Sequence, residues 1–240
     1  MNILKDILGV SKDLTVLSTG QNPELNKDLL VVGELTRDEF QSSLLEALVN
    51  VAEARLSDDA IVVQQDDNKV GVAYYTECSF NSLVADVANG RAIDPIVKHW
   101  SLGPWLPEIF ASDMARSLTL TESDSDSSRV AELFRQYPDP LREAIIARSL
   151  SEIAMKTAML EVGQYELSSK FLAMDICLAS MRLLYATEKI YFRGFKYEPL
   201  TRTSLSYEAG LISNRIMMNP ASEDSSMAVG HYLLSERRPK

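Results

Sequence analysis

Asn26 and Asp28 are the first residues whose types and spacing point to chemistry. They stand two positions apart in "NKD", directly before the apolar run Leu29–Val32. Side chains at positions i and i+2 of a strand point to the same face, so two acids with this spacing could hold one metal ion between them. Only one of the two is an acid here, and Asp28 is therefore the candidate metal ligand.

The elements around this pair predict a sheet. The segments "LTVLSTG" and "DLLVVGE" are short, apolar and bounded by turn residues, which is typical of buried strands that pair with each other. Thr36 and Glu39 form a capping-box pattern, and apolar residues at helical spacing continue to Leu56, which predicts a helix of about five turns. A hairpin with strands at 60–63 and 70–75 follows, turned at "DDNK".

From Ser79 onward the pattern is helical and strand signals vanish. "FNSLVADVANG" ends in a glycine of the C-cap type, and "PWLPEIFASDMARSLTL" begins with proline, as helices often do. The acidic, serine-rich stretch 121–129 predicts a solvated loop. Two long helical patterns follow, each long enough to span a bundle, and the tail predicts one or two more helices.

These patterns predict an α+β protein with two domains. Residues 1–94 would form an α/β domain with a small mixed sheet, and residues 95–240 a C-terminal helical bundle. A cleft between two such domains is a preferred place for a small-molecule site. A small-molecule ligand is therefore expected there.

Composition limits the classes of partner. The 240 residues are 46% hydrophobic, which is enough for a sizeable core, and the formal net charge of −10 argues against a broad nucleic-acid-binding face. No window approaches the roughly 18 uninterrupted apolar residues of a membrane span, and the N-terminus lacks a long apolar segment. Cys78 and Cys177 lie in apolar contexts without partners at metal spacing, which predicts buried thiols. We expect a cytoplasmic protein that binds neither nucleic acid nor membrane; a homodimer is compatible with the sequence.

Taken in order, these segments resemble the polymerase-beta-like nucleotidyltransferases, specifically the small-molecule branch that includes the aminoglycoside nucleotidyltransferases. The N-terminal half carries the resemblance in "STG" and "NKDLLVV". The C-terminal half carries it in "HWSLGPWLPEIFASDMA", "QYPDPLREAIIARSL" and "LLYATEKIYFRGFKYEPL". Together these segments cover about residues 14–200 in the family's order.

The resemblance implies a nucleotide site at the start of the sheet. In that family a Gly-Ser turn cradles triphosphate, and an Asp-x-Asp pair with a third acid from a later strand holds two Mg²⁺ ions. The turn corresponds here to Ser18, Thr19 and Gly20, and Asp28 would bind Mg²⁺ with the NTP. Asn26 replaces the first acid, and "VGVAYY" contains no third acid.

Asp66, Asp67 and Glu77 lie outside "VGVAYY", and each would need a register shift or a bulge to reach the metal in place of a missing carboxylate. Loss of two carboxylates from the metal shell should cost more than the ~10 to 100-fold that outer-shell changes cost. Two possibilities for the cofactor therefore stay open: Mg²⁺ with NTP, or no cofactor.

Two glutamates are candidate catalytic residues. Glu152 lies near the position where aminoglycoside enzymes of this family carry a general base that deprotonates the acceptor hydroxyl, and a raised pKa would suit that role. A solvated helix glutamate is the alternative. Glu108, in "PWLPE", is expected either in the interdomain cleft or at the positive end of its own helix.

Tyr191, Arg193 and Lys196 come from "YFRGFK", where a glycine lets the backbone turn so that cationic groups could converge on an anion. In the resembled family this region lines the cleft, which makes the three residues candidates for nucleotide binding. The structural alternative is a helix terminus.

Other aromatic and histidine residues are weaker candidates. Trp100, Trp105 and Tyr74 could stack on a base or a sugar, but such residues also serve as core. His99 and His231 are isolated in sequence, without a nucleophile or a metal-ligand spacing nearby.

Three functions remain open from sequence. An active enzyme would transfer a nucleoside monophosphate from NTP to a hydroxyl of a small molecule. A metal-free descendant would bind a ligand or scaffold a partner. A repurposed enzyme would use acids such as Glu108 or Glu152 on a small metabolite without a nucleotide.

Overall fold

The computed structural model describes most of the chain. The described residues are 7, 9–11, 13–18, 29–48, 53–56, 61–65, 68–91, 98–99, 103–104, 106–120, 125–162, 166–194, 204–218 and 222–236. The chain divides into two compact units, Met1–Gln136 and Tyr137–Lys240, and each is described by itself. The predicted α+β class is confirmed, with a sheet in the first unit and helices in the second.

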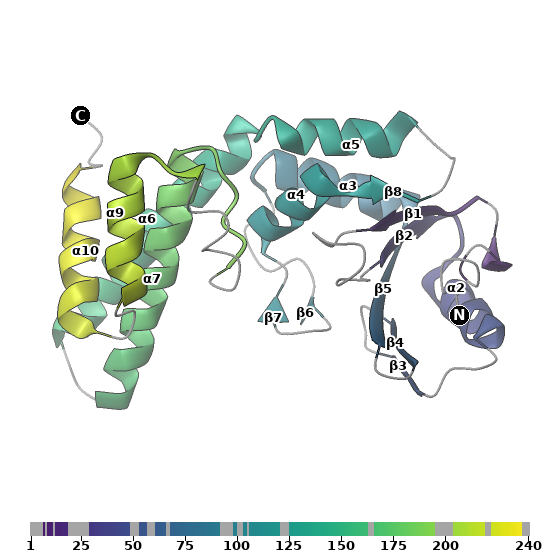
Figure 1. Ribbon diagram of the computed structural model, residues 1–240, viewed down its shortest axis with the longest axis horizontal. Helices are drawn as coiled ribbons and strands as arrows, with labels where there is room; N and C mark the ends of the chain where they lie inside the picture. The colour runs from purple at the N-terminus through teal and green to yellow at the C-terminus, as the bar shows by residue number, and fades with distance from the viewer. Residues whose placement is uncertain are drawn as a thin grey trace. The chain divides into compact units, whose positions relative to one another are not determined.

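The described part of the first unit contains a mixed sheet with strand order β3-β4-β5-β2-β1-β8 (Figure 1). Its strands are β1 (Thr15–Ser18), β2 (Leu29–Gly33), β3 (Glu53–Leu56), β4 (Ile61–Gln65), β5 (Asn68–Thr76) and β8 (Leu118–Thr119). The first two strands pair antiparallel, as the sequence predicts. β4 and β5 form the predicted antiparallel hairpin, and β5 runs parallel to β2.

Both faces of the central strands are covered, because every residue of β2 is buried. Leu29 and Val31 belong to one core cluster, together with Phe40 and Leu44 of the helix α2 (Arg37–Ala47). Leu30 and Val32 alternate with them and point to the opposite face, where α3 (Glu77–Ala88) contacts β2 and β5. The alternation explains why the sequence shows a continuous apolar run rather than an apolar-polar pattern.

The helix α2 begins as predicted and ends earlier. The Thr36 side chain accepts a hydrogen bond from the Glu39 backbone N–H, and the Glu39 carboxylate accepts one from the Thr36 backbone N–H at 2.8 Å. The helix ends at Ala47, whereas the apolar spacing predicted a helix to Leu56. That prediction was wrong because residues 53–56 form β3, which pairs with β4 and thereby satisfies its backbone groups in the sheet.

The helix α3 ends in the predicted glycine cap. Gly90 has a φ of +66°, and its backbone N–H donates to the Val87 carbonyl. The backbone N–H of Arg91 donates to the Asp86 carbonyl, and the two bonds together form a Schellman motif. Cys78 is exposed, in contrast to its predicted burial, because it lies on the face of α3 opposite Phe80 and Val84. Cys177 is buried as predicted, and burial raises the pKa of its thiol.

The remainder of the first unit is helical with three short strands. The helices are α4 (Pro107–Arg116) and α5 (Ser125–Arg135), which contact α3 and each other. β6 (Lys98–His99) pairs with β7 (Gly103–Pro104), and β8 pairs with β1, so strands do occur after Ser79. The predicted solvated loop at 121–129 was wrong from Ser125 onward, where α5 begins.

The second unit packs four described helices around one core (Figure 1). These are α6 (Asp139–Val162), α7 (Glu166–Thr187), α9 (Tyr207–Met218) and α10 (Glu223–Glu236). The two long helical patterns and the two tail helices are therefore confirmed. The predicted domain boundary at Asp94 lies outside the described residues. The compact units divide instead after Gln136, because α3, α4 and α5 group with the sheet.

Candidate functional site

The end of β1 and the start of β2 share one edge of the sheet. The two strands are antiparallel, and Ser18, the last residue of β1, is the Cα partner of Leu29, the first residue of β2. The Ser18 side chain is buried. Ser18 is the member of the predicted phosphate-binding turn that falls within the described residues. Thr19, Gly20, Asn26 and Asp28 lie outside them.

The strand beside β2 supplies no carboxylate to this edge. The described strand β5 reads Asn-Lys-Val-Gly-Val-Ala-Tyr-Tyr-Thr, and Val72 is the partner of Leu29. Glu77 follows Thr76, which pairs with Gly33 at the opposite end of β2, about 13 Å away for four residues of strand. Glu77 is therefore too far along the sheet to replace the missing acid; Asp66 and Asp67 lie outside the described residues.

The described part of the edge contributes no carboxylate to a metal site. Such a site needs several carboxylate ligands, and β1, β2 and β5 carry none within their described bounds. Across all described residues, no group of three or more His, Cys, Asp or Glu side chains is placed to hold a metal ion. Asp28 stays the candidate ligand on sequence grounds alone.

Glu108 lies in the first turn of α4, and its side chain is only 1% exposed. An acid in the first turn interacts favourably with the partial positive charge of the helix N-terminus. This position fits the structural explanation for Glu108, and a role in an interdomain cleft stays a prediction. Glu108 belongs to the first unit.

Glu152 is held by two arginines of the second unit. The Arg148 Nε donates to Glu152 Oε1 at 2.7 Å, and Arg182 Nη1 lies 3.8 Å from Glu152 Oε2. The Arg182 side chain is only 4% exposed, so its charge is largely withdrawn from water. Because a buried guanidinium needs a counter-charge, the Glu152 carboxylate has an electrostatic task that a solvated helix glutamate would lack.

Tyr191 lies just beyond the end of α7 in a packed environment. Its ring stacks on that of Tyr137, with centroids 4.2 Å apart and planes 15° from parallel. Burial raises the pKa of the Tyr191 phenol. Trp100 and Trp105 lie outside the described residues, whereas Tyr74 is a core residue that stacks on Phe40 and donates to the Leu35 carbonyl at 2.7 Å.

Arg193 is buried in the same segment, and Gly194 has a φ of +88°, a conformation that favours glycine. The backbone turn that the sequence predicts around this glycine is therefore present. Lys196 lies outside the described residues, so the predicted convergence of Tyr191, Arg193 and Lys196 stays a prediction. Ser18 and Glu108 belong to the first unit, and Glu152, Tyr191 and Arg193 to the second.

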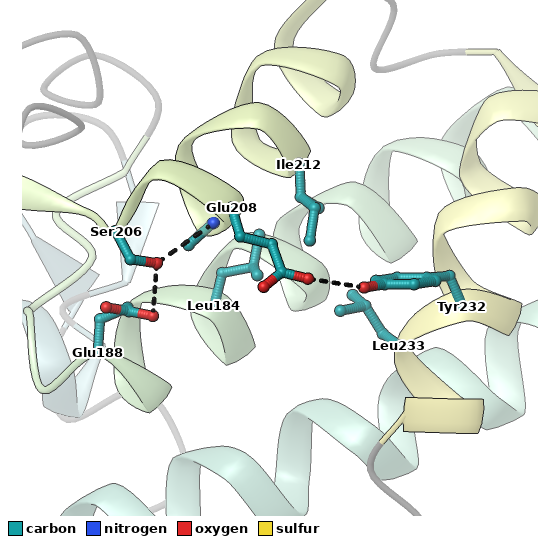
Figure 2. Close-up of a pocket in the computed structure, with 8 residues that line it drawn as sticks. Leu184, Glu188, Ser206, Glu208, Ile212, Tyr232 and Leu233 are labelled. Carbon is teal, nitrogen blue, oxygen red and sulfur yellow. Dashed lines mark hydrogen bonds between the residues drawn. The ribbon is translucent and has the colours of Figure 1, made fainter.

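A cavity of about 400 Å³ in the second unit was not predicted from sequence (Figure 2). Its lining residues come from the end of α7, the start of α9 and the middle of α10: Leu184, Glu188, Ser206, Glu208, Ala209, Ile212, Tyr232 and Leu233. These positions come from three separate stretches of the chain, so only the packing of the helices brings them together. Four of the lining residues are apolar and four carry polar groups, so the cavity is more polar than most ligand pockets.

Polar contacts fix the rim of this cavity. Ser206 Oγ donates to Glu188 Oε1 at 3.0 Å and accepts from the Ala209 backbone N–H, which makes Ser206 the cap of α9. The Tyr232 hydroxyl donates to Glu208 Oε1 at 3.1 Å. Figure 2 shows Glu208 and Tyr232 directed toward each other from α9 and α10.

Comparison of the chain with protein-family models and with curated proteins gave no match. Among the helices that the structure describes, none combines the length and apolar character required to cross a membrane.

Proposed function

We propose that this chain is a nucleotidyltransferase-like protein that binds a small molecule and does not carry out two-metal nucleotidyl transfer. One observation carries the proposal: Ser18 pairs with Leu29, and the strand that runs parallel to β2 has no acid. The pairing of Ser18 with Leu29 corresponds to the sheet edge at which the resembled family binds nucleotide. The lack of an acid in β5 removes a metal ligand on which the chemistry of that family depends.

An active nucleotidyltransferase is the principal alternative. It would use Asp28 for Mg²⁺, Ser18, Thr19 and Gly20 for the phosphates, and Glu152 as the base. The contacts of Glu152 argue for the non-catalytic form, because both carboxylate oxygens face guanidinium groups. Phosphoryl transfer depends mainly on positioning and charge stabilisation, so the loss of metal ligands affects the step that this fold normally supports.

Isothermal titration calorimetry with ATP, GTP, CTP and UTP tests the proposal. Each nucleotide is titrated once with millimolar Mg²⁺ and once with EDTA. We expect that Mg²⁺ does not increase the affinity for any of the four, because a single acid provides little charge to hold the ion against a triphosphate. Affinity at least about tenfold higher with Mg²⁺ would contradict the proposal and favour the active enzyme.

A further inference from the structure

The helix α9 buries one face and exposes apolar side chains on the opposite face. Its buried face is formed by three residues that pack on the core of the second unit: Ala209, Ser213 and Ile216. On the other side, Tyr207 is 84% exposed, Leu211 is 52% exposed and Met218 is 86% exposed. Asn214, which is also exposed, lies between Leu211 and Met218. Large apolar side chains therefore face solvent along α9.

These four exposed residues have the spacing of a contact between two helices. Positions 207, 211, 214 and 218 are four, three and four residues apart, so they form one line along about three helical turns. This is the spacing of the a and d positions of a heptad, through which helices pack side by side. We call this line of residues the α9 seam. A seam of this kind fits a second helix.

Two charges of opposite sign flank the α9 seam on the same side. Glu208 and Arg215 are seven residues apart, so both occupy e positions when Leu211 and Met218 occupy a positions. Both side chains are exposed. The Glu208 Oε1 accepts a hydrogen bond from the Tyr232 hydroxyl at 3.1 Å, which holds the carboxylate beside the seam (Figure 2).

This arrangement is complementary to itself. A two-fold axis perpendicular to two identical helices keeps each flank on its own side, so the e positions of one helix lie beside the e positions of the other. In such an antiparallel pair, Glu208 of each copy faces Arg215 of the other, which gives two contacts between opposite charges. In a parallel pair Arg215 would instead lie beside the uncharged Gly210.

The same axis also aligns the residues of the α9 seam. When it passes between positions 212 and 213, Tyr207 packs against Met218 of the second copy, and Leu211 lies beside Asn214. A thioether beside an aromatic ring is a favourable contact. A single polar residue such as Asn214 in a helix pair fixes the register at a cost in stability.

Other exposed apolar side chains of this unit lie beside acids that are already engaged. Asp175, next to Met174 of α7, pairs with Lys156 of α6. Glu161, next to Val162 of α6, contacts His231. Charge complementarity therefore favours α9 over these helices as a surface for a second copy.

We propose that two copies of this chain associate through α9 as an antiparallel, two-fold dimer. The seam is short, so the interface is smaller than the roughly 1,200 Å² at which stable interfaces begin. The dimer is accordingly weak, with a Kd on the order of 100 µM. The proposal depends only on the second unit and stands apart from the proposed function.

Sedimentation equilibrium of the full chain tests the proposal. Between about 5 µM and about 500 µM, we expect the mean mass to rise from 26.8 kDa toward twice that value. Leu211→Lys places a charge at the centre of the α9 seam and should keep the protein monomeric at the highest concentration. Phe171→Lys makes the same change on α7, where the side chain is 62% exposed, and should leave association unchanged. Circular dichroism checks that both variants fold.

Charge reversal tests the antiparallel pairing. Arg215→Glu turns both charged contacts into repulsive ones and should weaken association at least about tenfold. Glu208→Arg/Arg215→Glu exchanges the two charges and should restore association to within about threefold of wild type, because the flanks are complementary again.

Four results would overturn the proposal. A monomer at all concentrations would leave the α9 seam to a different partner. Association that survives Leu211→Lys, or that is lost in Phe171→Lys, would place the interface elsewhere. A double charge variant that associates as weakly as Arg215→Glu would exclude the antiparallel pairing.

Discussion

Replacement of Glu152 by glutamine is expected to lower the free energy of unfolding by about 2 kcal/mol. The carboxylate accepts from Arg148 at 2.7 Å and faces the buried Arg182 at 3.8 Å. The variant leaves Arg182 with less counter-charge in a site where its guanidinium is only 4% exposed. Urea denaturation followed by circular dichroism measures the change.

Two comparisons make this result specific to the ion pair. Glu143→Gln removes an exposed acid of the same helix and should change stability by less than about 0.5 kcal/mol. The double variant Glu152→Gln/Arg182→Met should be more stable than Glu152→Gln alone, because the buried charge is removed with its partner. Unchanged stability in Glu152→Gln would show that Glu152 has no structural task and would restore it as a candidate general base.

Replacement of Gly230 by alanine is expected to destabilise the second unit by about 2 kcal/mol. A Cβ at Gly230 of α10 would lie 2.9 Å from Thr157 Oγ1, 3.3 Å from Ile153 Cγ2 and 3.7 Å from Ile176 Cγ2. The first distance is below normal contact, so either the Thr157 side chain must rotate or α10 must move away from α6. Overpacking of this kind costs about 1 to 3 kcal/mol, measurable by the same denaturation experiment.

Gly210 provides the matched control for Gly230. It lies in α9, and an added Cβ would meet nothing within 4 Å. Gly210→Ala should therefore raise stability by about 0.5 to 1 kcal/mol, the gain of alanine over glycine in a helix. Thr157→Ala should recover part of the loss when combined with Gly230→Ala, because it removes the closest atom. A Gly230→Ala variant as stable as Gly210→Ala would mean that the helices adjust without cost.

Local signals in the sequence predicted the elements that depend on near neighbours. Thr36 and Glu39 are three residues apart and satisfy each other's backbone groups, so the start of α2 could be recognised without knowledge of the fold. Gly90 could be recognised in the same way, because a left-handed residue after a helix is commonly glycine. The β4–β5 hairpin also depends on a short connection.

Two elements decided by pairing with another strand were missed. Residues 53–56 continue the apolar spacing of α2, but pairing with β4 makes them a strand. Leu118 and Thr119 form β8 because Ser18 and Leu17 lie beside them, about one hundred positions earlier in the chain. The short window in which hydrophobic periodicity is assessed does not contain β1, the partner of β8, and within that window the apolar spacing of residues 53–56 matched a helix.

The candidate sites show the same division between local and distant information. The resemblance pointed to Glu152 as a candidate general base, but the sequence could not show that Arg182 of the next helix lies beside it. The cavity lined by Glu188, Glu208 and Tyr232 was missed because its acids come from separate elements. In contrast, the edge bearing Ser18 and Leu29 follows directly from pairing two predicted strands.

The Mg²⁺ dependence of the melting temperature of Asn26→Asp tests the central claim most directly. The substitution rebuilds the Asp-x-Asp pattern of the resembled family at residues 26 and 28. If the variant binds Mg²⁺ with a Kd near 1 mM, about 10 mM Mg²⁺ should raise its melting temperature by about 3 °C. Wild type should show no rise. A comparable rise in wild type, or none in Asn26→Asp, would contradict the account of a nucleotidyltransferase-like site that has lost its metal ligands.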